Sequence, residues 1–260
     1  MTRTYLVTGS ASGIGAATAE LLSSRGHKVI GVDLQNADIT VDLTTPEGRQ
    51  HMIDEAASLS GGRLDGIIAN AGISAPVAAT VQVNYFGALA TLEGLRPLLL
   101  ESDAPRAVVT ASMASLQPAD DELLAALIDG DETAAVARGS ALETAGPEAG
   151  YLNYSTSKQA IARWVRRHAP TPEWAGAGIP LNAIAPGVVL SPMTEQLVNS
   201  PEGRAQLEEQ VPMPLNGWMP AESAAELLAW LTSPANTHLC GQVIFIDGGV
   251  DAVFRGDSTW

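Results

Sequence analysis

Residues 5–22, YLVTGSASGIGAATAELL, decide the fold of this chain. The apolar residues at 5–7 are typical of a short buried strand, and the spacing of Ile14, Ala17 and Leu21 predicts a helix soon afterwards. Between them lies a turn in which three glycines follow a G-x-x-x-G-x-G spacing over 9–15. A strand, a glycine-rich turn and a helix in this order predict the first unit of a dinucleotide-binding fold.

Each glycine of this turn has a separate physical role. Gly9 permits a tight turn, Gly13 allows the backbone to approach a ligand, and Gly15 lets the helix pack close to the strand. The helix directs its free N–H groups and the positive end of its dipole at the turn, which favours a pyrophosphate there. We therefore expect the turn to hold the phosphates of a dinucleotide cofactor.

The second expected strand, residues 27–32, ends at Asp33. A carboxylate at this point is placed to accept hydrogen bonds from an adenosine ribose, and it would repel a 2′-phosphate. Leu34, Gln35 and Asn36 follow, and neither this segment nor the glycine turn contains Lys or Arg. These features favour NAD over NADP. The alternative interpretation is that Asp33 only caps a loop.

Strands and helices alternate along the rest of the chain. Further strands are expected at 39–43, 65–69, 104–111, 179–184 and 242–247, with helices after Thr45-Pro46, at about 80–100, at 151–168 and at 221–231. This alternation predicts an α/β fold: one Rossmann-type domain over 1–260, a doubly wound parallel sheet with helices on both faces. Residues 117–147, rich in Ala, Asp and Glu, are expected to form a helical insertion on the surface.

Length, charge and cysteine content limit the class of protein. A chain of 260 residues suits one α/β domain, and a net charge of −15 argues against a nucleic-acid or anionic-membrane partner. Cys240 is the only cysteine, so no disulfide framework and no metal site are expected. No apolar stretch reaches membrane-spanning length and the first strand begins near the first residue, so we expect a cytoplasmic enzyme without a signal peptide.

Tyr154 and Lys158 are four residues apart and share one face of the helix expected at 151–168. Hydride transfer between an alcohol and a nicotinamide needs a partner for the alcohol proton, and a free tyrosine with a pKa of about 10 is a poor base at neutral pH. A nearby ammonium and the positive nicotinamide of NAD⁺ would favour the phenolate and lower that pKa. Taken alone, the pair could be a packed tyrosine and a solvated lysine. With Ser112 at the carboxyl end of a strand, where such sheets bind ligands, we expect a catalytic pair.

The chain resembles the short-chain dehydrogenase/reductase family over essentially its whole length. The motifs that carry the resemblance are TGSASGIG at 8–15, Asp42-Leu43, Asn70-Ala71-Gly72, Asn84, Ser112, Tyr154 with Lys158, and Pro186-Gly187. Within the family it is most similar to bacterial 3α-hydroxysteroid dehydrogenase/carbonyl reductases. That similarity comes from VNYFGA at 83–88, IAPG at 184–187, IDGGVDAV at 246–253 and the long interval between Ser112 and Tyr154.

The resemblance implies a catalytic role for four residues. Tyr154 would be the general acid/base, and Ser112 would hydrogen-bond the substrate oxygen. Lys158 would hold the ribose hydroxyls and tune Tyr154, while Asn84 would organise a water that relays the proton onward.

The resemblance also extends the cofactor site beyond the glycine turn. The Val189 backbone and the Ser191 hydroxyl would hold the carboxamide, although the family more often has a threonine at the position of Ser191. The expected cofactor contacts are Gly9, Ser12, Gly13, Ile14, Gly15, Asp33, Leu34, Asp42, Leu43, Asn70, Ala71, Gly72, Tyr154, Lys158, Pro186, Gly187, Val189 and Ser191.

Residues 190–218 are proline-flanked and are expected to form a lid over the substrate. The expected substrate contacts are Ala114, Met193, Leu197, Met213 and Trp218. The alternative for the four lid residues is that they belong to the core.

We therefore expect an NAD(H)-dependent oxidoreductase that interconverts a bulky apolar secondary alcohol and its ketone, such as a hydroxysteroid, an aryl ketone or a cyclic alcohol. An epimerase or dehydratase on the same scaffold and an NAD-binding regulatory protein are the alternatives. The resemblance also implies a homodimer or homotetramer, with a subunit contact altered by the insertion.

Overall fold

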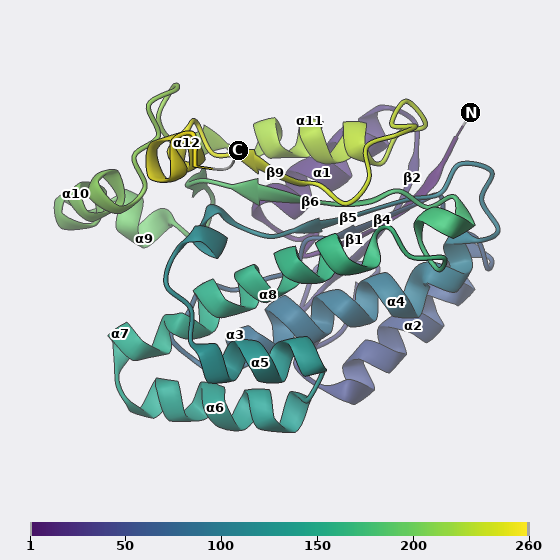
Figure 1. Ribbon diagram of the computed structural model, residues 1–260. Helices are drawn as coiled ribbons and strands as arrows, with labels where there is room; N and C mark the ends of the chain where they lie inside the picture. Colours follow the sequence, from purple (N-terminus) through teal and green to yellow (C-terminus); the bar gives the residue numbers. More distant parts are fainter. Residues whose placement is uncertain (1, 259–260) are drawn as a thin grey trace.

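The computed structural model describes residues 2–258. Its central sheet has seven parallel strands in the order β3-β2-β1-β4-β5-β6-β9 (Figure 1). The strands are β1 (Thr4–Thr8), β2 (Lys28–Asp33), β3 (Ile39–Thr40), β4 (Gly66–Ala69), β5 (Arg106–Thr110), β6 (Leu181–Pro186) and β9 (Val243–Ile246). Two further strands, β7 (Val189–Leu190) and β8 (Met219–Pro220), form a separate parallel pair. The expected parallel α/β sheet is confirmed.

Helices cover both faces of the sheet. α1 (Gly13–Ser24) and α11 (Ala221–Leu231) lie on one face, and α2 (Pro46–Ser60), α4 (Ala88–Leu99) and α8 (Leu152–His168) lie on the other (Figure 1). Successive residues of β1 therefore enter different cores: Leu6 packs with the α2–α4–α8 side, and Val7 packs with the α1–α11 side. Burial on both faces explains why these strands are continuous apolar runs and not alternating ones.

Two expected elements differ in the structure. The strand expected at 39–43 is reduced to the two residues of β3, because the Asp42 side chain accepts hydrogen bonds from Thr44 and begins a turn. The helix expected at 80–100 is divided into α3 (Ala79–Val81), the π-helical turn η1 (Gln82–Gly87) and α4. A π-helical turn inserts extra residues into a helix and rotates its side chains, and Asn84 is buried within η1.

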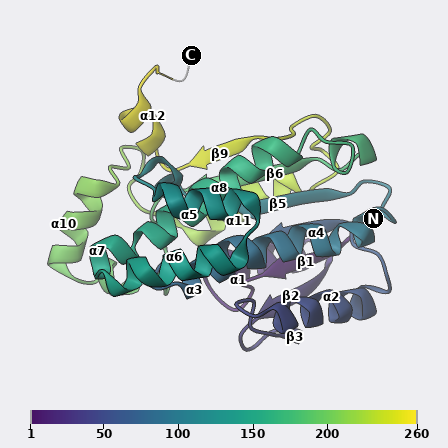
Figure 2. The ribbon, with the colours of Figure 1, turned by 60° about the horizontal axis from the view of Figure 1, so that its bottom comes forward.

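The segment at 117–147 forms an outer layer of helices. α5 (Asp121–Asp129) and α6 (Glu132–Thr144) lie side by side, and the short α7 (Pro147–Gly150) leads into α8 (Figure 2). The segment is helical as expected, but it also contributes side chains to the hydrophobic core. Leu123, Leu127 and Leu142 are buried in the main core, because their spacing places them on the inner sides of α5 and α6.

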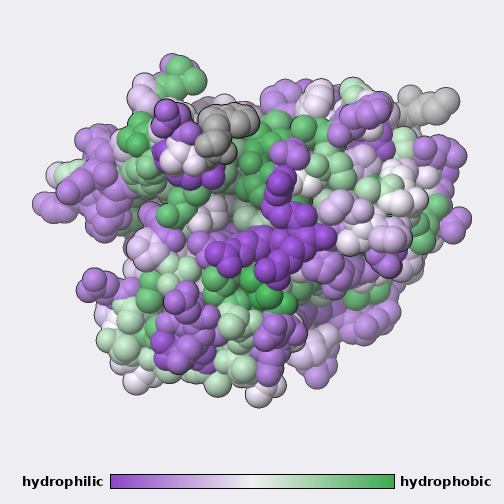
Figure 3. Space-filling view, viewed as in Figure 1, coloured by the Kyte–Doolittle hydropathy of each residue, from purple (hydrophilic) through white to green (hydrophobic). Residues whose placement is uncertain are grey.

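The carboxyl ends of the strands face a region built from short helices. α9 (Glu195–Val198), α10 (Pro201–Gln210) and α12 (Val250–Arg255) lie beyond this edge of the sheet (Figure 1). The outer end of α10 is largely hydrophilic (Figure 3). Two 3₁₀ turns, η2 (Met113–Leu116) and η3 (Ala175–Ala177), complete the described elements. Within residues 2–258, none of the helices has the length and apolar character needed to span a membrane.

Candidate active site

The glycine turn between β1 and α1 is built for close backbone approach. Gly9 and Gly13 have φ angles of +71° and +53°, which strain any residue with a side chain. The Gly9 N–H donates to the Val32 carbonyl at 2.8 Å, which ties the turn to β2. A Cβ on Gly15 would lie 1.9 Å from the Gly9 carbonyl oxygen, so α1 packs directly against the turn.

Asp33 at the end of β2 faces this turn. One carboxylate oxygen accepts from the Ala11 N–H at 2.9 Å and the other accepts from the Leu34 N–H at 2.7 Å. These two contacts are those expected if Asp33 caps a loop, which is the alternative to ribose binding. A carboxylate oxygen has two lone pairs, so both oxygens keep accepting capacity for a ribose hydroxyl. Leu34 is 65% exposed.

Asp42 and Leu43 have mainly local contacts. The Asp42 carboxylate accepts from the Thr44 N–H at 2.9 Å and from its hydroxyl at 2.7 Å. The Leu43 side chain is buried in the main core, which leaves its backbone for any contact with a ligand. The sequence does not distinguish these turn and core roles from cofactor contacts.

The segment Asn70-Ala71-Gly72 follows β4 and is held by two threonines. The Thr8 hydroxyl oxygen accepts from the N–H groups of Asn70 and Ala71, both at 3.0 Å. The Thr110 hydroxyl donates to the Asn70 side-chain oxygen at 3.0 Å. Neither threonine is among the expected site residues, although each ends a strand that leads to the site.

Asn84 is 1% exposed, and its side chain binds the backbone of Ile73, which follows Gly72. Its side-chain oxygen accepts from the Ile73 N–H and its amide donates to the Ile73 carbonyl, both at 2.9 Å. The same amide lies 3.3 Å from the Ser157 hydroxyl. A Cβ on Gly72 would lie 3.0 Å from the Asn84 oxygen and 3.4 Å from Lys158 Nζ. Asn84 Oδ1 and Lys158 Nζ therefore lie beside the same face of Gly72.

Ser112, Tyr154 and Lys158 come together at the carboxyl edge of the sheet. Ser112 follows β5, and its hydroxyl lies within hydrogen-bonding reach of the Tyr154 hydroxyl on α8. Lys158, one turn further along α8, has Nζ 5.9 Å from the centroid of the Tyr154 ring. Lys158 is 4% exposed and donates to the Thr110 carbonyl at 2.9 Å. The structure thus brings the expected catalytic side chains into one cluster.

Burial controls the protonation of this cluster. Burial raises the pKa of Tyr154, and the hydrogen bond with the Ser112 hydroxyl opposes that rise only in part. Burial also lowers the pKa of Lys158 to about 8. Desolvation sets the direction of the Tyr154 shift in this structure. The lowering expected from the Lys158 ammonium together with the positive nicotinamide of bound NAD⁺ stays a prediction. Both groups are held towards their neutral forms.

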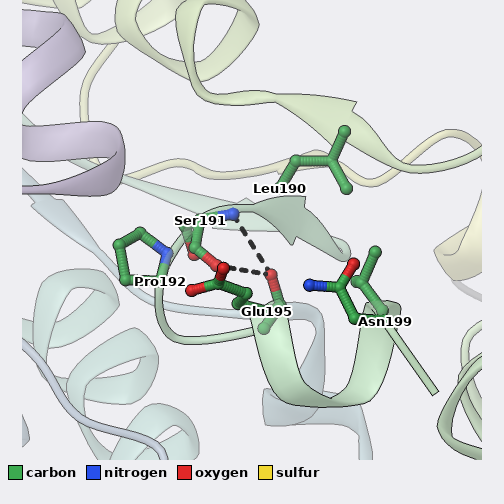
Figure 4. Close-up of a pocket in the computed structure, with 7 residues that line it drawn as sticks. Leu190, Ser191, Pro192, Glu195 and Asn199 are labelled. Carbon is green, nitrogen blue, oxygen red and sulfur yellow. Dashed lines mark hydrogen bonds between the residues drawn. The ribbon is translucent and has the colours of Figure 1, made fainter.

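A pocket of about 350 Å³ lies at the beginning of residues 190–218, the segment expected to form a lid (Figure 4). It adjoins the glycine turn, because a Cβ on Gly13 would lie 3.3 Å from Ser191 Cβ. The Thr194 hydroxyl donates to the Val189 carbonyl at 2.6 Å, and its oxygen accepts from the Ser191 N–H at 3.2 Å. Thr194 is not among the expected site residues, yet it holds both expected carboxamide contacts in place. The pocket is lined by Leu190, Ser191, Pro192, Thr194, Glu195, Val198 and Asn199.

Pro186 ends β6 and Gly187 follows it, just before the segment expected to form a lid. A Cβ on Gly187 would lie 3.0 Å from Met213 Sδ and 3.0 Å from Asp247 Cα. The Val188 N–H also points to Met213 Sδ, at 3.3 Å. Met213 therefore covers this motif directly, and any larger residue at position 187 would displace it.

The five expected substrate contacts divide into two groups. Ala114, Met213 and Trp218 belong to or pack against one apolar cluster that also includes Tyr154. Met193 and Leu197 are 51% and 40% exposed and lie outside that cluster. The structure therefore supports an apolar wall beside Tyr154, formed by three of the five residues.

Comparisons with known proteins agree with this geometry. A family model described as short chain dehydrogenase matches residues 3–123, and one described as Enoyl-(Acyl carrier protein) reductase matches residues 124–251. The 3-alpha-hydroxysteroid dehydrogenase/carbonyl reductase of Comamonas testosteroni is 36% identical over 96% of this chain and 97% of its own. The cis-4-hydroxycyclohexanecarboxylate dehydrogenase of Sinomonas cyclohexanicum is 30% identical, with 96% and 97% covered.

A solved structure is similar over the whole fold. The crystal structure of the 3-alpha-hydroxysteroid dehydrogenase from Pseudomonas sp. B-0831 complexed with NADH has a TM-score of 0.89 and 37% sequence identity. The alignment covers 98% of this chain and 99% of that one. The resemblance seen in the sequence motifs is confirmed: the chain is an oxidoreductase that belongs to the short-chain dehydrogenase family.

Proposed function

We propose that this protein is an NAD(H)-dependent oxidoreductase that interconverts a bulky apolar secondary alcohol and its ketone. The observation that carries the proposal is the cluster of Ser112, Tyr154 and Lys158 beside an apolar wall at the carboxyl edge of the sheet. Two neighbouring hydroxyl groups, with an ammonium beside them, suit proton transfer to or from one substrate oxygen.

The residues around the glycine turn fit a dinucleotide. No side chain caps the N-terminus of α1 at Ser12, so the first N–H groups of this helix are available to a pyrophosphate. The positive φ angles of Gly9 and Gly13 keep side chains out of the same space. NAD, when bound, would supply or accept the hydride. Asp33, without a neighbouring Lys or Arg in the sequence, favours NAD over NADP.

Tyr154 is the residue that exchanges a proton with the substrate oxygen. Its raised pKa keeps the hydroxyl protonated at neutral pH, which is the form that protonates the oxygen of a ketone during reduction. The Ser112 hydroxyl donates a hydrogen bond to the same oxygen and so stabilises the charge that develops there. In the oxidation of an alcohol the Tyr154 oxygen accepts the proton.

Lys158 and Asn84 support Tyr154. The Lys158 ammonium beside the Tyr154 ring stabilises the phenolate that forms when the proton leaves. Asn84 and Lys158 Nζ lie beside the same face of Gly72, and we assign to Asn84 the ordering of a water through which the proton continues outward.

The apolar wall and the relatives favour a cyclic alcohol as the substrate. Ala114, Met213 and Trp218 belong to or pack against the apolar cluster on which Tyr154 also packs, which suits a bulky hydrocarbon ring. The printed names of two relatives, a 3-alpha-hydroxysteroid dehydrogenase and a cis-4-hydroxycyclohexanecarboxylate dehydrogenase, both denote a secondary alcohol on a ring. We extend this substrate class to the present chain.

We also propose that the protein forms a homodimer or homotetramer in the cytoplasm. α5 packs on α8, so a second copy that approaches this side of α8 meets the insertion first (Figure 2). An altered subunit contact would follow. Light scattering of the purified protein tests the assembly, and a monomer at micromolar concentration would contradict it.

The experiment that tests the proposed function is NADH consumption with a 3-oxosteroid, an aryl alkyl ketone and a cyclic monoterpene ketone. We expect turnover of at least one of these ketones, and a strong steroid signal would support a long, open substrate site. Aryl turnover without steroid turnover would indicate a narrower site. NADH binding without turnover of any ketone would contradict the proposal and favour a regulatory NAD-binding protein.

A further inference from the structure

Three buried polar side chains of α8 have no part in the chemistry described above. Asn153, Ser155 and Thr156 surround Tyr154 in the sequence and are 0%, 5% and 0% exposed. Burial of a polar group is costly unless a hydrogen bond compensates for it. The hydrogen-bond partners of these three side chains therefore show which segments are attached to the first part of α8.

Their partners lie on the segment that follows Ser112 and on the insertion. The Ser155 hydroxyl donates to the Pro118 carbonyl at 2.6 Å, and the Thr156 hydroxyl oxygen accepts from the Asp120 N–H at 2.9 Å. The Gln159 amide donates to the Ser115 carbonyl at 3.3 Å. Residues 115–120 are thus bonded to α8 at three points, beginning three residues after Ser112.

The far end of this segment is held by the insertion. The Asp120 carboxylate caps α5 by accepting from the Leu123 N–H at 2.8 Å. It also accepts two hydrogen bonds from Arg138 of α6, at 2.9 Å and 2.6 Å. Asn153 donates to the carbonyl of Gly139, the next residue of α6, at 3.1 Å. Paired charge-assisted hydrogen bonds of this kind fix orientation as well as distance.

We propose that Asp120 and Thr156 are positioning residues, which hold the segment that begins at Ser112 against α8 and thereby set the Ser112 hydroxyl against the Tyr154 hydroxyl. The insertion is then part of the catalytic apparatus, because Arg138 fixes Asp120. This inference rests on the proposed function, in which those two hydroxyl groups act together on one substrate oxygen.

The Ser112–Tyr154 contact gives the proposal a specific readout. Burial raises the Tyr154 pKa and the Ser112 hydroxyl lowers it, and no carboxylate or arginine of the described residues contributes to its shift. The cation near its ring is Lys158. On the insertion side, the charges of Asp120, Arg138 and Glu122 are engaged with one another. Movement of Ser112 away from Tyr154 would therefore raise the apparent pKa of catalysis.

The test compares Thr156→Val with Thr156→Ser in the full-length protein. Valine keeps the shape of threonine but cannot accept from the Asp120 N–H, whereas serine can. For Thr156→Val we expect a fall in kcat of about 10- to 100-fold, the range for misplaced reacting groups. We also expect an upward shift in the apparent pKa of alcohol oxidation and an unchanged Kd for NADH. Thr156→Ser should restore both kcat and the pH profile.

Thr232→Val is the matched control. Thr232 is a fully buried threonine whose hydroxyl donates to the carbonyl of Leu228 in α11. It lies beside Gly66, at the amino end of β4, whereas Ser112 follows the carboxyl end of β5. Its replacement should lower the melting temperature and leave the pH profile unchanged. The control therefore separates loss of stability from loss of positioning.

An unchanged pH profile and kcat in Thr156→Val, with only a lower melting temperature, would overturn the proposal. A fall in kcat that serine does not rescue, or that leaves the apparent pKa unchanged, would also overturn it. If Thr156→Val does not fold, Ser155→Ala removes the bond to Pro118 and is judged by the same kcat and pH readouts. Failure of the proposed function is recognised separately, because Tyr154→Phe would then keep its turnover.

Discussion

Replacement of Lys158 by methionine should change how stability depends on pH. Methionine has nearly the length of lysine but no charge, so it tests the cost of the buried ammonium. Lys158 is 4% exposed, and burial lowers its pKa from 10.5 to about 8. A shift from 10.5 to about 8 corresponds to about 3 kcal/mol, at about 1.4 kcal/mol per unit of pKa.

The free energy of unfolding changes with pH because the folded and unfolded states bind different numbers of protons. Between about pH 8 and pH 10.5 the folded protein has released the Lys158 proton, while the unfolded chain still holds it. The unfolded state then binds more protons, so this group makes the free energy of unfolding rise with pH in that window. The variant lacks this contribution. The difference in unfolding free energy, wild type minus variant, should rise by about 3 kcal/mol across the window.

Urea denaturation from pH 7 to pH 10.5, at one protein concentration, measures this difference. Equal m values at each pH would show that the two proteins unfold to comparable states. Lys28→Met removes the other lysine of the chain, at an exposed position on β2, and controls for the loss of one cation from an acidic protein. A difference that stays flat from pH 8 upward would refute the reasoning that burial destabilises the Lys158 ammonium.

Three further substitutions test the cofactor site. Asp33→Ala should lower the ratio of Kd for NADPH to Kd for NADH and also weaken NADH, because Asp33 holds the Ala11 N–H; an unchanged ratio in fluorescence titrations would remove Asp33 from cofactor choice. Gly15→Ala places a Cβ 1.9 Å from the Gly9 carbonyl oxygen, so we expect a loss of about 1–3 kcal/mol of stability and weaker NADH binding. Wild-type melting temperature and Kd would contradict that. Thr194→Val frees the Val189 carbonyl and the Ser191 N–H and should raise KM for NADH, with Thr194→Ser close to wild type; equal KM values would show that Thr194 has no such role.

The alternation of strands and helices and the positions of the glycine turn and of Tyr154 with Lys158 can be predicted from the sequence, because each depends on a local sequence pattern. Apolar strand runs, the glycine spacing and the i, i+4 relation of Tyr154 and Lys158 all depend on residues close together in the chain. Opposite burial of Leu6 and Val7 on the two faces of the sheet is the expected result of such runs.

Other features depend on tertiary contacts and cannot be derived in the same way. Asn84 is a polar residue in a helical pattern, and only the π-helical turn directs it to Ile73. The Tyr154 pKa moves upward because the whole surrounding core desolvates it, whereas the sequence shows only the nearby lysine.

The insertion at 117–147 has features of both kinds: some follow from local spacing and others depend on tertiary contacts. Leu123 and Leu127 are four residues apart and are both buried, so their spacing alone could have indicated an inner face. The bond from Asp120 to Thr156 joins segments 36 residues apart, and no local pattern predicts it.

The most direct test of the proposed function is the turnover of Tyr154→Phe, with the Kd for NADH measured on the same preparation. Phenylalanine keeps the ring beside Lys158 and removes the hydroxyl that transfers the proton. We expect kcat to fall by about 10²- to 10⁴-fold, the usual contribution of a general acid or base, while the Kd for NADH stays close to that of the wild type. Turnover at the wild-type level with intact NADH binding would contradict the assignment of Tyr154 and the mechanism built on it.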